Sequence, residues 1–373
     1  MRTLLLTLTT CLFVLPATAK YSGGSGTGEP NDPYQIGTAA DLIALGENPN
    51  DYDKHFIMTA DIDLDPNLPG RKVFDKAVIA PDVDEASEWV QGTPFTGVFD
   101  GGGHTISHLT ITGDGYLGLF GQLGVPYVPA GEVKDLGVVD VSVTGSDQCV
   151  GGLAGDNYGA VTDCYSTGVV SGTSGVGGLV GWNLGSVTNC YSRGAVSGID
   201  FVGGLVGSNY SWFIDWEGSV TQCYSTGTAH SINCVVAGLV AENKGTVTCC
   251  YSTGAVSGST KAELWAAGLV ASNSGTITNC YSTGAVSGSG WYVGGLTCWS
   301  MGTATGCFWD IQTSGQATSA GGTGMTTRQM RSSRTFLDAG WDFVGETANG
   351  TEDIWWILEG KDYPKLWWEA AEK

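Results

Sequence analysis

The stretch CYSTGAVSGSGWYVGGL, residues 280–296, indicates the fold because nearly the same sequence occurs four times upstream of it. Its Cys-Tyr pair has counterparts that begin at residues 164, 190, 223 and 250, and a degenerate Cys-Phe pair follows at residue 307. The period is therefore 26 to 33 residues. A period of this length is typical of arrays in which each unit buries its apolar face only against its neighbours.

Within each copy, β-branched residues alternate with small polar ones and glycine interrupts every few positions. This pattern predicts short strands joined by tight turns. We therefore expect an all-β fold, a right-handed parallel β-helix (β-solenoid) of about seven coils with N- and C-terminal caps. The coils are five full copies, a weaker copy from Val133 and a half-copy from His108.

Aligned columns indicate which side chains face the core. Small apolar residues recur just before the Gly-Gly-Leu motifs, and a leucine recurs within each motif. An asparagine column follows, and because asparagine tolerates left-handed turns and its amides can bond from coil to coil, we expect a structural asparagine ladder rather than a ligand site. Its members are Asn157, Asn183, Asn209, Asn243 and Asn273.

Cysteines form another column, made of Cys164, Cys190, Cys223, Cys250 and Cys280, with Cys307 after them. In-register side chains point the same way, which suits a disulfide dihedral poorly, so we predict a ladder of buried thiols. A metal site is disfavoured because no Cys-x-x-Cys or histidine cluster accompanies the column. Off-column cysteines are the better disulfide candidates, namely Cys149, Cys234, Cys249 and Cys298.

Composition narrows the function. The chain has 373 residues, 59 of them glycine, only 14% charged residues and a net charge of −21. Such a charge argues against nucleic acid and anionic membranes as partners. Residues 1–19 are typical of a signal peptide, with cleavage expected after Ala19, and no later segment is long enough for a transmembrane helix. We therefore expect a secreted or cell-surface protein.

The flanks of the repeats lack the period. Residues 20–100 are expected to form an N-terminal cap, with a short helix that begins at a Thr38–Asp41 capping box and a strand in HFIMTADIDL. Residues 101–310 hold the repeats. Residues 311–373 are expected to form a Trp-rich C-terminal cap, with a short helix through Met330 and Phe336 and tryptophans that close the open coil.

The repeats resemble the GLUG repeat, whose GLxG core stands here as Gly152-Leu153-Ala154-Gly155, Gly178-Leu179-Val180-Gly181 and Gly204-Leu205-Val206-Gly207. The NCYSTGxVSG segment also matches the GLUG repeat. The resemblance implies a β-helical secreted bacterial protein, adhesin-like in many cases. The family also includes repeats attached to IgA-specific metallopeptidases, but their HExxH motif does not occur in this sequence, and the resemblance supplies no catalytic residues.

Aromatic residues recur at a variable position beside the core columns, which we expect to face outward. They predict a binding strip for an extracellular glycan or a surface protein. Its members are Phe201, Trp265, Trp291 and Tyr292. The alternative is a polysaccharide-degrading β-helix enzyme, a lyase or a glycoside hydrolase. The coils hold few basic residues for that chemistry: Lys134, Arg193, Lys244 and Lys261.

Two motifs near the N-terminus contain polar residues that could serve catalysis or metal binding instead of a structural role. In DGGGHTISH, Asp100, His104 and His108 could do acid–base work, but the glycines favour a turn. In DIDLD, the carboxylates of Asp61, Asp63 and Asp65 would suit Ca²⁺, although the EF-hand pattern fails. No other cofactor is expected.

Overall fold

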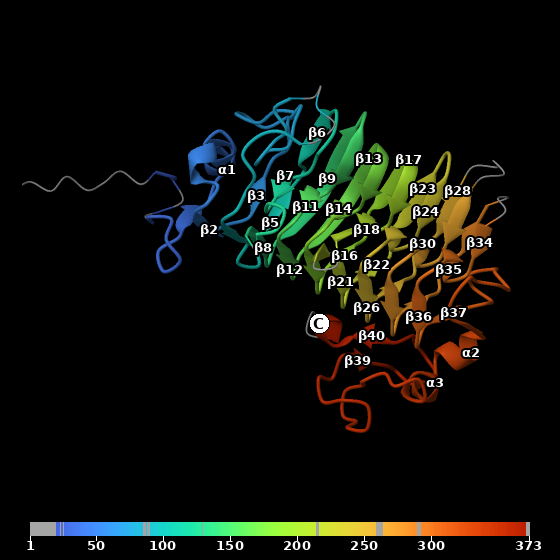
Figure 1. Cartoon of the computed structure of the whole chain (residues 1–373). Helices are drawn as coiled ribbons and strands as arrows, with labels where there is room; N and C mark the ends of the chain where they lie inside the picture. The colour runs from blue at the N-terminus through green and yellow to red at the C-terminus, as the bar shows by residue number, and fades with distance from the viewer. Residues whose placement is uncertain are drawn as a thin grey trace, which may run out of the picture.

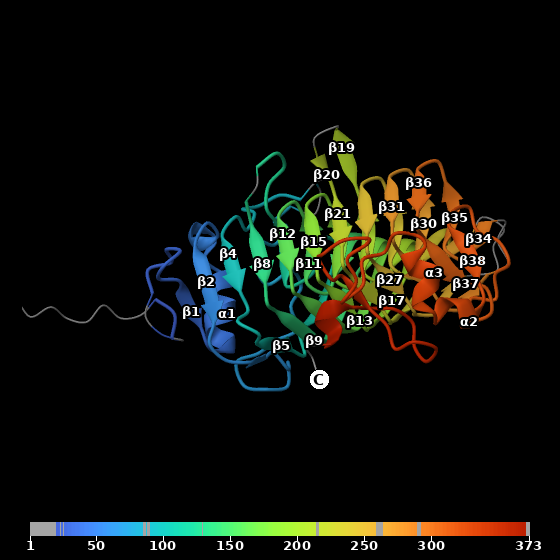
Figure 2. The ribbon, with the colours of Figure 1, turned by 90° about the horizontal axis from the view of Figure 1, so that it is seen from below.

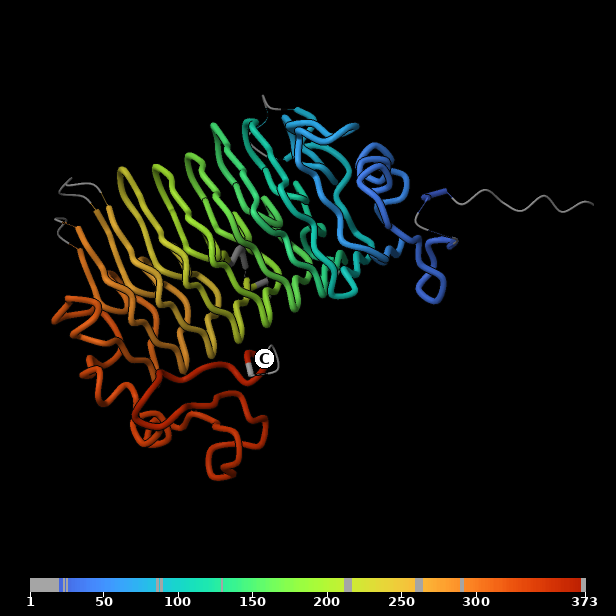
Figure 3. Tube along the Cα trace, turned by 180° about the vertical axis from the view of Figure 1, so that it is seen from behind, coloured from blue at the N-terminus to red at the C-terminus, as the bar shows by residue number. Residues whose placement is uncertain are grey.

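The computed structural model describes residues 20–370, apart from residues 23, 25, 85–86, 88–89, 129, 214–215, 259–263 and 289–291. It is a parallel β-helix whose coils stack one on another along the molecule (Figures 1 and 3). Each full repeat contributes strands to three sheets, and these run along three sides of the coil. The prediction of a parallel β-helix is confirmed. The predicted signal peptide lies outside the described residues.

The first sheet has ten strands in the described part of the chain. They are β1 (Tyr34–Ile36), β2 (His55–Met58), β4 (Val98–Asp100), β8 (Glu132–Lys134), β12 (Ala160–Thr162), β15 (Ser186–Thr188), β21 (Ser219–Thr221), β26 (Thr246–Thr248), β31 (Thr276–Thr278) and β36 (Thr303–Thr305). The last seven come from the repeats. The first three come from residues 20–100, so the range assigned to a cap also contributes strands to the ladder.

The second sheet contains the longest strands, and the strands of the third sheet have four residues each in the described part of the chain. The second is built from β3 (Ile62–Asp63), β5 (Thr105–Ser107), β6 (Thr110–Gly113), β9 (Gly137–Gly145), β10 (Gln148–Gly151), β13 (Tyr165–Gly177), β16 (Tyr191–Ser192), β17 (Ala195–Gly203), β22 (Tyr224–Ser225), β23 (Thr228–Ser231), β24 (Val235–Ala237), β27 (Tyr251–Ser252), β28 (Val256–Gly258), β29 (Trp265–Ala267), β32 (Tyr281–Ser282), β33 (Val286–Ser287), β34 (Tyr292–Gly294), β37 (Phe308–Asp310) and β38 (Thr323–Met325). The third is built from β7 (Phe120–Leu123), β11 (Ala154–Asn157), β14 (Val180–Asn183), β18 (Val206–Asn209), β25 (Val240–Asn243), β30 (Val270–Asn273) and β35 (Thr297–Ser300).

Strands of successive coils pair in parallel and in register, as predicted. Val150 pairs with Val176, which pairs with Val202. The leucine column is fully buried, and its members are Leu153, Leu179, Leu205, Leu239, Leu269 and Leu296. A slip of one residue would turn every such column toward solvent, so burial of one face holds the register.

The N-terminal end is closed by helix α1 (Ala39–Gly46). The predicted capping box is present, since the Thr38 hydroxyl accepts from the Asp41 N–H and the Asp41 carboxylate accepts from the Thr38 N–H. Leu42 and Leu45 of this helix are fully buried in the main core. A one-turn 3₁₀ segment (Pro49–Asp51) leads into β2. The single strand expected in HFIMTADIDL is two strands, β2 in the first sheet and β3 in the second.

The last coil is closed by the loop that connects β37 to β38. The Gly295 N–H donates to the Thr318 carbonyl at 3.0 Å, and the Trp309 Nε1–H donates to the Gln316 carbonyl at 3.0 Å. Trp309 belongs to the main core cluster. This loop, rather than the tryptophans of the tail, covers the open end.

The tail instead folds back along the side of the β-helix (Figures 2 and 3). It comprises α2 (Thr327–Met330), α3 (Ser333–Leu337), the hairpin of β39 (Trp355–Trp356) and β40 (Lys365–Leu366), and a 3₁₀ turn (Trp367–Ala370). The single short helix expected through Met330 and Phe336 is thus two helices.

A stack of tyrosine rings lies beneath this tail. It is made of Tyr165, Tyr191, Tyr224, Tyr251 and Tyr281. Neighbouring ring centroids are 4.8 to 5.0 Å apart and the planes differ by at most 9°. Trp368 stacks on the Tyr224 ring at 5.5 Å, and Trp355 contacts the Tyr281 ring at 6.1 Å. Trp341 and Trp355 of the tail are therefore core residues, as expected, but of a lateral cluster, whereas Trp367 is exposed.

Candidate functional site

The chain turns sharply at each Gly-Gly-Leu motif, which connects a strand of the second sheet to a strand of the third. Side chains seven positions apart, one on each side of the turn, approach each other on the outer surface. A methyl group on Gly175 would collide with the indole of Trp182, for example. Val235 and Glu242 line one hollow together. This corner is where the variable aromatic residues gather.

The hollow has a volume of about 410 Å³ and is here called the aromatic cavity. It is lined by Phe201, Cys234, Val235, Glu242, Lys244, Trp265, Ser272, Ser274 and Trp299. Ligand sites in proteins commonly combine apolar and aromatic walls with a few polar groups in this way.

One wall of the aromatic cavity is a group of rings in the last coils. The centroid of the Trp265 ring lies 5.7 Å from that of Trp299 and 5.3 Å from that of Tyr292. Trp265 and Tyr292 are paired residues of adjacent parallel strands. Trp265 is half-buried, whereas Tyr292 is 43% exposed. Part of this wall is therefore aromatic surface exposed to solvent, and the three rings contact one another.

The opposite side carries an ion pair. The Lys244 Nζ lies 3.1 Å from Glu242 Oε1 and 3.8 Å from the centroid of the Tyr210 ring. Burial alone would lower the pKa of Lys244, but the bond to Tyr210 and the Glu242 carboxylate raise the pKa above its ordinary value. Lys244 is therefore charged at neutral pH, and its charge is compensated by Glu242.

The strip residues are only partly brought together. Phe201 and Trp265 line the cavity, Tyr292 contacts Trp265, and Trp291 lies outside the described residues. The expectation that the whole column faces outward is wrong, because Cys149 and Val235 are buried by neighbouring coils and Trp265 is half-buried. Trp299, Glu242 and Lys244 were missed; the seven-residue spacing across the turn would have found Trp299 and Glu242, and Lys244 follows Glu242 by two residues on the same side of the turn.

The five cysteines of the column and Cys307 are buried. The Cys164 N–H donates to Cys190 Sγ at 3.3 Å, and the same contact repeats along the column. Each thiol donates to the carbonyl two residues earlier, as Cys190 does to Thr188 at 3.0 Å. Burial raises the pKa of Cys190 and Cys280 well above the ordinary value, which keeps both as S–H donors.

No disulfide joins any of the ten cysteines in the described part of the chain, so the expectation of off-column bridges is wrong. Cys149 lies in the corner between the two sheets and Cys249 in the turn before Cys250, where its φ is 52°. Cys298 donates to the Ala271 carbonyl at 3.0 Å. At the positions of these thiols, the other coils carry different residue types.

We expect alkylation of the native protein with iodoacetamide to leave Cys190 and Cys280 unmodified, because both are fully buried. Cys234, half-buried at the wall of the aromatic cavity, should react first. Unfolding without reductant should make all the described thiols reactive, as peptide mass spectrometry would show. A Cys164–Cys190 disulfide peptide, or labelling of native Cys280, would contradict the thiol ladder.

The asparagine column forms a continuous buried ladder. Each Nδ2 donates to the Oδ1 of the next asparagine, at 2.7 Å from Asn157 to Asn183 and 2.8 Å from Asn209 to Asn243. The last member, Asn273, donates to the Ser300 hydroxyl at 3.1 Å. These asparagines end strands of the third sheet and have no positive φ, so the left-handed part of the expectation is wrong.

Left-handed turns occur instead at the residue before each cysteine of the column and at the residue before Leu136, which takes the place of the cysteine in the weaker copy. Their φ values are 50° to 63°, at Asp135, Asp163, Asn189, Gln222, Cys249, Asn279 and Gly306. The aspartate and asparagine that dominate this column are the residues that tolerate the conformation best.

The N-terminal histidines pair with the acidic DIDLD motif. His104 Nδ1 lies 3.2 Å from Asp61 Oδ1, and His108 Nδ1 lies 2.8 Å from Asp63 Oδ1. Strand β3 pairs with β5, and this pairing brings the two motifs together. Asp100 accepts from the Gly102 N–H, in a turn. Across the described residues, no group of three or more such side chains is placed to hold a metal ion.

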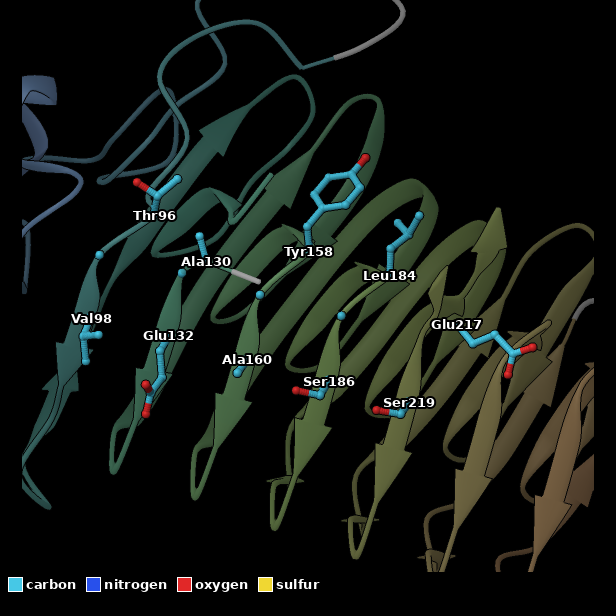
Figure 4. Close-up of a pocket in the computed structure, with 14 residues that line it drawn as sticks. Thr96, Val98, Ala130, Glu132, Tyr158, Ala160, Leu184, Ser186, Glu217 and Ser219 are labelled. Atoms are coloured by element: carbon cyan, nitrogen blue, oxygen red, sulfur yellow. The ribbon is translucent and has the colours of Figure 1, made fainter. Parts of the chain in front are cut away.

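A second hollow, of about 560 Å³, lies on the outer face of the first sheet (Figure 4). Its floor is formed by small side chains such as Ala160, Ser186 and Ser219, between the loop before β8 and the hairpin of β19 (Ser211–Phe213) and β20 (Trp216–Glu217). Glu132 lies on β8 and Glu217 in the hairpin before β21, and the strands β8 and β21 are three strand spacings apart, about 14 Å. Glycosidases hold their two carboxyl groups about 5 to 9.5 Å apart. The two strands are spaced more widely than that.

Comparisons with known proteins agree with this architecture. The model of the GLUG motif matches residues 172–197 and 202–229. The chain is 35% identical over 156 residues to halomucin of Haloquadratum walsbyi, which covers 40% of this chain and 2% of that protein. It is also 35% identical over 153 residues to a putative Gly-rich membrane protein of Evansella cellulosilytica, 38% of this chain and 15% of that protein.

A solved structure shares the fold. The crystal structure of a putative immunoglobulin A1 protease from Bacteroides ovatus superposes with a TM-score of 0.57 over 92% of this chain and 95% of that one, at 18% identity. At this identity the likeness shows the fold alone. Among the described residues, no helix has the length and apolar character to cross a membrane. The chain carries GLUG-motif repeats, which build a parallel β-helix.

Proposed function

We propose that this chain is an exported, surface-associated β-helix that binds glycan through the aromatic cavity. The observation that carries the proposal is the cavity itself, where Trp265, with Trp299 and Tyr292 beside it, faces a polar pair. Aromatic rings stack on the apolar faces of sugars, and neighbouring polar groups can bond to the hydroxyls. The signal-like N-terminus and the names of the two relatives support export to a surface.

Binding accounts for the cavity better than hydrolysis does. Hydrolysis of a glycosidic bond uses two carboxyl groups. Among the described residues that line the aromatic cavity, Glu242 is the one carboxylate, and it is paired with Lys244. In the second hollow, the strands β8 and β21, next to its two glutamates, are spaced more widely than such a pair. An adhesive or structural role is therefore proposed ahead of a polysaccharide lyase or hydrolase.

Replacing both Trp265 and Tyr292 with alanine should weaken glycan binding about tenfold, because two stacked rings contribute on the order of 1–2 kcal/mol. A glycan array would identify the ligand, and titration against that ligand would measure the loss. The melting temperature should hardly change, since Tyr292 is exposed and Trp265 half-buried. The matched control is Trp367→Ala, which removes an exposed indole from the tail.

Two results would count against the proposal. If the double variant binds as tightly as the parent, the aromatic wall is incidental. If it unfolds, the rings belong to the core and the loss of binding says nothing of recognition; Trp299→Ala, titrated in the same way, would then test the same wall from the neighbouring sheet.

A further inference from the structure

We propose that the outer face of the first sheet binds ice, through rows of threonine side chains that hold water at the spacing of an ice lattice. This surface is here called the threonine face, and it covers the six consecutive strands β12, β15, β21, β26, β31 and β36. The aromatic cavity, in contrast, is lined by residues of the second and third sheets and of the turns beside them. The proposed glycan binding and this activity therefore use different surfaces.

Two columns of side chains point outward from these strands, one on each side of a core-facing residue. The parallel pairing keeps both columns in register, and Figure 4 shows Ala160, Ser186 and Ser219 following one another on adjacent strands. The second column is threonine in all six coils, and the first is threonine in the last three. The first column is Ala160, Ser186, Ser219, Thr246, Thr276 and Thr303, and the second is Thr162, Thr188, Thr221, Thr248, Thr278 and Thr305.

Strand propensity alone does not explain this uniformity. Threonine is favoured in strands in general. In the third sheet, however, the corresponding outward positions of six successive coils hold unlike residues, namely Asp156, Trp182, Ser208, Glu242, Ser272 and Trp299. The chain has 16 basic and 37 acidic residues, yet no outward position of the threonine face is charged. A neutral surface of hydroxyls and methyl groups is therefore a specific feature of this side of the β-helix.

Two buried ladders fix the backbone beneath both columns. Each asparagine amide donates to the carbonyl of the first-column residue in the next coil, as Asn209 does to Thr246 at 3.2 Å. Each cysteine thiol donates to the carbonyl of the second-column threonine two residues earlier, as Cys250 does to Thr248 at 3.1 Å. Side-chain ladders of this kind stabilise flat, regular sheets. The threonines are thus held at a constant spacing before they meet a ligand, which lowers the entropic cost of binding.

The spacing of the threonines is close to that of water molecules in ice. Neighbouring strands are about 4.8 Å apart, and the two outward residues of one strand are about 6.6 Å apart. Water molecules on the prism faces of an ice crystal repeat in a rectangular lattice whose two spacings lie within about a tenth of these distances. Because the array is only six coils long, the mismatch along its axis accumulates to a fraction of one lattice spacing.

The side chains also have the chemistry to order water in such a lattice. Within the described residues, none of the nine threonine hydroxyls bonds to another protein group, so each can donate one hydrogen bond to water and accept two. The methyl group beside each hydroxyl favours ordered first-shell water. Thr276, Thr303 and Thr305 are exposed, and the other six threonines are half-buried. A growing ice surface can therefore reach both columns in the last coils.

The test is Thr276→Lys, which places a long charged side chain in the middle of the last three coils. We expect the parent to shape a seed ice crystal and to hold its growth below the melting point. The variant should lose this gap between melting and freezing temperatures, measured by nanolitre osmometry, and Thr303→Lys should repeat the loss one coil further on. The matched control is Thr228→Lys, at an exposed threonine of the second sheet, which should keep the gap. The thermal unfolding midpoint should change little in all three variants, because the three threonines are exposed.

A second measurement needs no variant. When ice is grown slowly from a dilute solution of the parent protein and serum albumin, the parent should be enriched in the ice while albumin remains in the liquid. Ice that excludes both proteins equally would overturn the inference.

The remaining outcomes separate this inference from other roles of the same face. If Thr276→Lys and Thr303→Lys shape ice as the parent does, the threonine face is not the ice-binding surface. If the parent binds powdered cellulose or chitin and Thr276→Lys abolishes that binding without any effect on ice, the face recognises a polysaccharide, and the inference is refuted. The Trp265→Ala, Tyr292→Ala double variant should keep the full ice activity, so a failure of glycan binding would leave this inference intact.

Discussion

Replacing Asn209 with leucine should destabilise the protein by about 3–5 kcal/mol, because several buried polar groups lose their partners at once. The Asn209 Nδ2 donates to the Gly218 carbonyl at 2.9 Å and to Asn243 Oδ1 at 2.8 Å, and its Oδ1 accepts from Asn183 at 2.7 Å. Leucine has a similar volume but offers none of these bonds. Urea unfolding followed by circular dichroism would measure the loss.

The matched control is Ser208→Ala, next to Asn209 on the same strand. Ser208 points away from the ladder, at the position paired with Trp182 of the previous coil. We expect this change to cost less than about 1 kcal/mol. Equal unfolding midpoints for Asn209→Leu and Ser208→Ala would show that the ladder contributes little to stability. Because each coil contacts only its neighbours, Asn209→Leu should weaken the coupling between coils and so broaden the urea unfolding transition.

Replacing Asp156 with asparagine should stabilise the protein at pH 8 by as much as about 4 kcal/mol and hardly at all at pH 4. Asp156 is 2% exposed, and its Oδ1 has no hydrogen-bond partner among the described residues. Burial raises the pKa of this carboxyl to about 7, although a hydrogen bond from Tyr158 opposes the rise. The parent therefore buries a charge at pH 8 that the variant does not.

The sign follows from proton binding. Between pH 3.8 and about 7 the folded carboxyl keeps a proton that the unfolded one has lost, so the free energy of unfolding falls as pH rises through this range. Above pH 7 the loss is complete. The control is Asp163→Asn, an exposed turn residue whose counterpart in the next coil is Asn189; its effect should be the same at both pH values. If the free energy of unfolding of the Asp156→Asn variant does not exceed that of the parent at pH 8, the Asp156 carboxyl is not a buried group with a raised pKa.

Much of the fold could be predicted because each coil repeats the same physical problem. A valine or leucine in the same place of every copy must face the same core, so the columns revealed both the strand order and the register. The helix at Thr38–Asp41 was predictable for a local reason, since its capping box lies within four residues. The path of the tail was not predictable, because its tryptophans contact tyrosines far away in the sequence.

The candidate site was half predictable. Variation in an otherwise regular column identified Phe201 and Trp265, but burial of individual members depends on the size of the side chain across the turn. Cys149 and Val235 are buried because of neighbours in other coils. Glu242 and Lys244 carried no signal of their own as members of a variable column.

The parallel β-helix, the register of its coils and the asparagine and cysteine columns follow from the sequence alone, because they depend on contacts that recur once per period. Three features became known from the tertiary structure alone: the thiols are unbridged, the tail covers a stack of tyrosines, and Trp265 and Trp299 line a cavity together with Glu242 and Lys244. These features depend on which unlike side chains meet in space, and a repeat pattern records only what its copies share.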